Sequence, residues 1–166
     1  MKKKIIAVVS WIITIWICKV FLLSLPYKFT GHPDTQHIFG TIGAWISGIF
    51  GDTIGNLFAS VGAIGVGSVE LITSLVLLTP ALLFLLSKLG MSPAQGYRAK
   101  FHRIGGAMSA VVMLGAVFFH LFTPLGIEVL HQGKSDGGSL FYAALSILVL
   151  GIVMVIINSL KIEEAT

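Results

Sequence analysis

Charged residues are scarce in this chain. Only 11% of its 166 residues are Asp, Glu, Lys or Arg, whereas 55% are hydrophobic. Soluble domains carry about 25% charged residues, so this composition excludes an ordinary soluble domain and indicates a membrane protein. The net charge of +4 does not indicate a nucleic-acid partner. Its cations cluster at residues 2–4 and 88–103, beside apolar runs, which is the pattern of cytoplasmic loops in membrane proteins.

Cysteine and catalytic motifs are also scarce. Cys18 is the single cysteine, which excludes an internal disulfide and a C-x-x-C pair. The sequence contains no G-x-S-x-G, P-loop or dinucleotide-binding motif, so it assigns neither a reaction nor an intrinsic cofactor. His32 and His37 are separated by five positions, and no H-x-x-x-H or H-E-x-x-H occurs, so we expect no metal site.

Long hydrophobic runs are abundant. We predict four membrane-spanning helices, because a span needs about 20 mostly apolar residues. The first has no small-residue cleavage site after it and is interpreted as an uncleaved anchor closed by Pro26. The spans form one domain over residues 1–166, an all-α four-helix bundle, and lie at about 5–25, 59–86, 104–122 and 140–160.

The lysines and arginines predict the orientation of the bundle. With the cations inside, both termini and the loop 87–103 face the cytoplasm of a bacterial cell, and the protein lies in the inner membrane. Arg98, Lys100 and Arg103 make this loop a candidate docking surface for a partner.

Two segments do not fit a simple span. Residues 38–58 have apolar side chains at helical spacing with glycines between them, which predicts one or two short amphipathic helices at the outer interface. Pro80 lies inside the second span and predicts a kink or an early end near Thr79.

Ionisable residues within the spans provide a candidate site. Counting residues from the outer ends places Lys19, Glu70 and His120 in the outer half of the membrane. An unpaired carboxylate in lipid costs at least about 2.5–3.5 kcal/mol, so we expect Glu70 to be protonated, paired or hydrogen-bonded. The candidate partners of Glu70 are Lys19, Lys28, Tyr27 and His120.

This constellation supports two interpretations. In the functional one, a neutral Glu70 donates a hydrogen bond to a ligand carbonyl and His120 relays a proton, which suits a quinone or a lipid-like head group. In the other, the polar groups form a clasp that sets helix register, and Lys19 extends to the membrane surface on its long side chain. Small residues on the faces of Glu70 and His120 predict that the second and third spans pack there.

Several stretches together resemble the DoxX-like membrane proteins. They are YKFTGHPDTQHIFGTIG (27–43), GVGSVELITSLVLLTP (65–80), GAVFFHLFTPLGI (115–127) and DGGSLF (136–141). The resemblance implies a four-helix membrane bundle and an association with membrane redox complexes, such as a thiosulfate:quinone oxidoreductase or complexes that handle thiol stress. It also implies, from animal relatives, a role in assembling membrane receptors. The positions that it marks are Lys28, Thr30, Glu70, His120 and Asp136.

Three functions follow as hypotheses. The first is a redox-associated subunit, with a quinone or lipid-like ligand and a membrane or soluble redox partner. The second is a non-catalytic scaffold or assembly factor that docks partners on the loop 87–103. The third and weaker hypothesis is a small permease, which would need a homo-oligomer because four helices form a narrow bundle.

Overall fold

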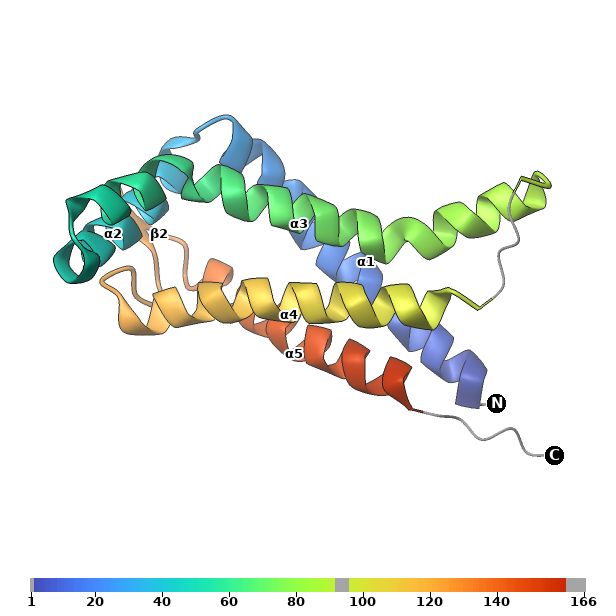
Figure 1. Ribbon diagram of the computed structural model, residues 1–166. Coiled ribbons are helices and arrows are strands. Elements are labelled where there is room, and N and C mark those ends of the chain that lie inside the picture. The colour runs from blue at the N-terminus through green and yellow to red at the C-terminus, as the bar shows by residue number, and fades with distance from the viewer. Residues whose placement is uncertain (1, 92–95, 161–166) are drawn as a thin grey trace.

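The computed structural model describes residues 2–91 and 96–160, and these form five helices and one short β-hairpin (Figure 1). The elements are α1 (Lys2–Phe29), α2 (Pro33–Phe50), α3 (Asp52–Lys88), α4 (Arg98–Phe122), β1 (Leu130–His131), β2 (Lys134–Ser135) and α5 (Ser139–Ser159).

Four of these helices, α1, α3, α4 and α5, are long and apolar enough to cross a membrane. The predicted multi-pass membrane protein is therefore confirmed at this level. The first turn of α1, the last turn of α3, the first turn of α4 and the last turn of α5 all lie at one end of the bundle (Figure 1). We call this end the terminus end. Helix α2 and the β-hairpin lie at the opposite end, the α2 end.

Two apolar clusters hold the bundle together. The main core joins the four long helices through fully buried side chains such as Ile17, Phe21 and Leu77. A smaller cluster at the α2 end joins α2 to the loop after α4 through Ile42, Ile46, Leu125 and Val129.

Pro26 does not end α1, so the predicted boundary there is wrong. The helix continues to Phe29, and the carbonyl of Pro26 accepts a hydrogen bond from the Thr30 N–H at 3.1 Å. A proline removes its own N–H donor but leaves its carbonyl available to the following turn. This continuation places Lys28 on the same helix face as Ser24, one turn earlier.

Helices α2 and α3 form a tight hairpin around Gly51, whose φ of +87° favours glycine. The first turns of α3 therefore occupy the last part of the segment 38–58, in which we predicted one or two short helices. The glycines between the apolar positions allow the two backbones to approach closely. A methyl group at Gly43 would lie 2.7 Å from the Gly55 carbonyl oxygen, and one at Gly55 would collide with the Gly43 carbonyl and Ser47.

Helix α3 does not end near Thr79, and of the two predicted outcomes the structure shows the kink. The helix runs through Pro80 to Lys88, and its axis turns away from the bundle in its last part (Figure 1). Its 37 residues would span roughly 56 Å, well beyond the ~30 Å hydrocarbon core. Leu82, Phe84 and Leu85 are exposed on this last part.

The small residues of the spans pack differently from our expectation. Gly67 on α3 lies against Phe29 and Lys28 of α1, not against α4. On α4, Gly106 lies against Gly151 and Met154 of α5, and Gly105 lies against Leu77 of α3. Spacing on one helix identifies a face for close approach, but it does not identify which neighbour will occupy it.

Candidate functional site

A cavity of about 980 Å³ lies at the α2 end of the bundle. Phe21, Met113 and Ala144 of the main core line it, as do Ile42 and Leu125 of the smaller cluster, so the cavity separates the two clusters. All five helices contribute to its wall. Its volume is at the upper end of the range for small-molecule sites.

The cavity opens onto the apolar surface of the bundle. Leu23 on α1, Val69 on α3 and Val111 on α4 line it and are 64%, 40% and 71% exposed. Because α1, α3 and α4 are candidate membrane spans, this opening would face lipid acyl chains.

An ion pair lies in the wall of this cavity. Lys28 Nζ donates to Glu70 Oε2 at 2.8 Å and to Ser24 Oγ at 2.8 Å, and Ser24 Oγ is 2.9 Å from the same carboxylate oxygen. Glu70 is only 3% exposed, and the Lys28 side chain is 16% exposed. Of the three states expected for Glu70, the structure shows pairing and hydrogen bonding, and Lys28 is the partner. A paired carboxylate accepts hydrogen bonds, so this geometry does not favour the neutral, donating Glu70 of the functional interpretation.

His120 lies in the wall of the same cavity, on α4. Its Nδ1 is 2.7 Å from the carbonyl oxygen of Gly126, and its ring packs edge-on against Phe141 with ring centroids 5.7 Å apart. The α4 helix and the loop that follows it thus hold the imidazole in one orientation. Glu70 and His120 share the cavity, and no direct contact joins them among the described residues.

Asp136 organises the loop between α4 and α5. Its Oδ1 accepts from the N–H groups of Val129 and Gly138, and its Oδ2 accepts from the Leu140 N–H and the Ser139 hydroxyl. Burial alone would raise the pKa of Asp136, but these donors together hold it below its usual value. Asp136 also lines the cavity, and its hydrogen bonds indicate that its main role is to shape this loop.

A group of histidines surrounds Asp34 at the rim of the cavity. His131 Nδ1 on the β-hairpin is 2.6 Å from Asp34 Oδ1 on α2, and His32 Nδ1 is 3.5 Å from Asp34 Oδ2. The hydrogen bond from His131 is the largest cause that lowers the pKa of Asp34. His37 stacks on His131 with the rings 17° from parallel. The nitrogens of two stacked rings do not point at a common metal position. Within residues 2–91 and 96–160, no group of three or more His, Cys, Asp or Glu side chains is arranged to hold a metal ion.

Three other residues that the sequence offered as site candidates, Tyr27, Thr30 and Lys19, lie at the edge of the cavity or outside it. Tyr27 lines it and is 52% exposed, with its ring against His32. Thr30 is exposed and donates to the Pro26 carbonyl. Lys19 is exposed on another face of α1, with Nζ 5.8 Å from the centroid of the Trp16 ring. The structure therefore does not bring Lys19 or Thr30 to the cavity.

The three cations predicted for partner docking are not equivalent. Arg98 donates to Asn158 Oδ1 at 3.0 Å and is partly buried, so it ties α4 to α5. Lys100 and Arg103 are exposed at the terminus end. Residues 92–95 of this loop lie outside the described residues.

Sequence reasoning missed two features. Ser24 was not marked, although its spacing of four from Lys28 could have shown that the two share a face. At the terminus end, the Asn158 amide donates to the fully buried Ser10, and the nearby His102 is fully buried against Trp11. Both ring nitrogens of His102 are fully enclosed.

Comparison with known proteins adds no relative to this picture. A scan of protein-family models, a search of curated proteins and a search of solved structures each find no match to this chain.

Proposed function

We propose that this protein is a redox-associated membrane subunit that binds a quinone-like or lipid-like molecule in the cavity at the α2 end. The observation that supports it most is the cavity of about 980 Å³, whose wall is mainly apolar and carries the Lys28–Glu70 pair and His120. Ligand sites typically combine an apolar wall with a few convergent polar groups. Ionisable groups within membrane spans usually serve function.

The geometry suggests how such a ligand would lie. Its polar head group would reach Lys28, Glu70 and His120, and its apolar tail would leave past Leu23 and Val111. The chain's own residues would bind and orient the head group. Electrons would pass between bound small molecules or come from a partner protein, because no motif assigns a resident redox group.

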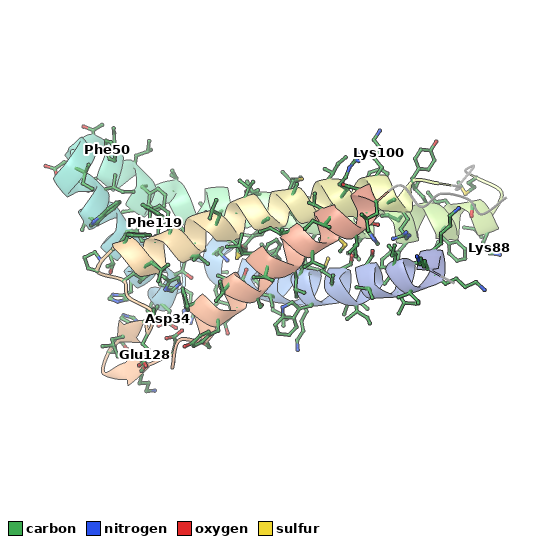
Figure 2. The ribbon with its side chains drawn as sticks, turned by 90° about the horizontal axis from the view of Figure 1, so that it is seen from below. Asp34, Phe50, Lys88, Lys100, Phe119 and Glu128 are labelled. Atoms are coloured by element: carbon green, nitrogen blue, oxygen red, sulfur yellow. The ribbon has the colours of Figure 1, made fainter. Side chains whose placement is uncertain are left out.

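Membership of the DoxX-like family and the orientation in the membrane belong to the same proposal. Lys88 and Lys100 lie at the terminus end, and Asp34 and Glu128 lie at the α2 end (Figure 2). With the positive-inside rule, this distribution supports an orientation in which both termini would lie in the cytoplasm of a bacterial cell, the α2 end would face outward, and α2 would lie at the outer interface of the inner membrane.

Glycine replacements offer a direct test. Gly65 and Gly115 line the cavity, and a Cβ at either position would meet no atom within 4 Å. Gly65→Leu and Gly115→Leu should therefore fill the cavity without disturbing the helices. Gly48→Leu is the matched control, because Gly48 is equally open but does not line the cavity.

The measurement is mass spectrometry of small molecules that co-purify with the protein in mild detergent. We expect a defined head-group molecule in stoichiometric amount with the wild type and Gly48→Leu, and its loss from Gly65→Leu, Gly115→Leu and Glu70→Gln. If all five proteins carry the same bulk lipids, the cavity is not a specific ligand site and the proposal fails.

A second candidate, a membrane scaffold, is favoured by the last part of α3. Beyond Pro80 this segment leaves the bundle with Phe84 and Leu85 exposed, near the end that bears Lys100 and Arg103. If it docks partners, the Lys100→Gln/Arg103→Gln protein should lose specific co-purifying proteins that Lys19→Gln retains. Equal recovery from both would exclude docking through these cations.

A further inference from the structure

The hydrogen bond of His120 determines which tautomer of its ring faces the cavity. A backbone carbonyl can only accept a hydrogen bond, so the contact of 2.7 Å between Nδ1 and the Gly126 oxygen requires the proton on Nδ1. In the neutral ring, Nε2 then carries a lone pair and no proton. Nε2 makes no hydrogen bond within the described residues, and it is not among their fully enclosed unpartnered atoms, so it remains accessible.

Glu70 presents a second acceptor. Its Oε2 atom takes the hydrogen bonds from both Ser24 and Lys28. Its Oε1 atom has no hydrogen bond in the described part of the chain, and it too is not fully enclosed. The carboxylate therefore keeps one oxygen for a ligand that enters the cavity.

Lys28 supplies the cationic donor beside these two acceptors. Lys28 uses two of its three N–H groups on Ser24 and Glu70, which leaves one. Around the Lys28–Glu70 pair and His120, the cavity thus offers a ligand two groups that can only accept, His120 Nε2 in the neutral ring and Glu70 Oε1, and one cationic donor, Lys28 Nζ. The hydroxyls of Tyr27, Thr35 and Ser139 also line the cavity, and each of them can either donate or accept.

From this balance we propose that the cavity selects a hydroxyl-bearing, hydroquinone-type head group over the corresponding oxidised quinone. The inference rests on the proposed function and narrows its ligand class. A hydroquinone can donate its hydroxyl protons to His120 and Glu70, and its oxygens can also accept from Lys28. A quinone has only acceptor oxygens, so it can bond to Lys28 or to a hydroxyl of the wall, but it leaves His120 Nε2 and Glu70 Oε1 without a partner.

The size of the preference for hydroquinone over quinone can be judged from other polar sites. Such sites reject a ligand that leaves the polar groups of the protein without a hydrogen-bond partner. A site built to bond a ligand hydroxyl can discriminate by about 10⁴–10⁵ in a fully closed pocket. This cavity is open on one side, so water can satisfy part of what a quinone leaves unpaired. We expect the reduced form to bind at least about tenfold more tightly.

The test uses the full-length protein in lipid nanodiscs with a short-chain benzoquinone and its hydroquinone, under anaerobic conditions. Equilibrium dialysis gives the dissociation constant of each form. His120→Phe keeps a flat ring against Phe141 but removes the Nε2 acceptor, and Glu70→Gln replaces the second acceptor by an amide. His37→Phe is the matched control, since His37 lies outside the cavity lining.

We expect the wild type and His37→Phe to favour the hydroquinone at least about tenfold, with most of this preference lost in His120→Phe and Glu70→Gln because these variants bind the hydroquinone more weakly. The wild-type ratio decides the matter even if a variant fails to fold. This inference is overturned if both forms bind equally, or if the quinone binds more tightly. If Gly115→Leu abolishes that binding, the ligand still lies in the cavity and the proposed function stays intact. No binding of either form, or binding that Gly115→Leu does not affect, overturns both this inference and the quinone-like ligand of the proposed function.

Discussion

Loss of the Lys28 amine should destabilise this protein strongly. In Lys28→Met the Glu70 carboxylate, 3% exposed, would keep only the Ser24 hydroxyl as a donor. Removal of one partner from a buried ion pair typically costs about 3–5 kcal/mol, because the other charge stays buried without compensation. For a chain of this size that corresponds to a decrease in melting temperature of about 6–20 °C.

A second substitution should reverse most of this loss. In the double variant Lys28→Met/Glu70→Leu no charge remains, and Ser24 can still donate to the Phe21 carbonyl at 2.7 Å. Apolar replacement of a whole buried pair is often neutral or stabilising. The double variant should therefore melt well above Lys28→Met.

The assay is thermal unfolding in mild detergent, with Lys19→Met as the control. Lys19 lies on the same helix but is exposed, and its contact with the Trp16 ring is worth about 0.5–1 kcal/mol. If Lys28→Met and Lys19→Met melt at the same temperature, or if the double variant is less stable than Lys28→Met, burial of the unpaired Glu70 charge does not determine the stability of the contact between α1 and α3.

Two further predictions concern the α2 end. The pKa values of Asp34 and Asp136 are lowered in the folded protein, so their contributions to stability are full above pH ~4 and are lost as the pH falls through these lowered values. Melting temperatures measured between pH 2.5 and 6 should decrease toward acid in the wild type, and less steeply in Asp34→Asn/Asp136→Asn; parallel curves would contradict this. Gly55→Ala should cost about 1–3 kcal/mol because its methyl group collides with Gly43 of α2, whereas Gly48→Ala, which meets no atom within 4 Å, should gain up to about 1 kcal/mol. Thermal unfolding of the two alanine variants checks this, and equal melting temperatures would exclude close packing of α2 on α3.

The long helices could be predicted because their signal is local. About 20 consecutive apolar residues specify a span whatever lies beside it, so all four appear where hydropathy places them. Their ends were less predictable. Pro26 was predicted to close the first span and Pro80 to cause a kink or an early end, but a proline removes only one backbone donor. Beyond Pro26, Lys28 and Phe29 pack against Gly67 of α3, whereas α3 continues past Pro80 as a helix that leaves the bundle.

The candidate site was predictable only in part. Burying Glu70 in a span demands a partner, and the sequence offered four candidates at a plausible depth. The choice of Lys28 depends on how α1 crosses α3, which also turns Lys19 to the exposed surface. Sequence spacing cannot give such a crossing, because it is set by close contacts such as that of Gly67 with Lys28 and Phe29.

By itself, the sequence determined the membrane environment, the four spans and the need of Glu70 for a partner, because each depends on composition or on the solvation of one residue. Only the tertiary structure decided that Glu70 pairs with Lys28 and Ser24, that His120 Nδ1 contacts the Gly126 carbonyl, and that Glu70 and His120 line one cavity. These features depend on the relative placement of five helices, which follows from side-chain packing between segments far apart in the chain.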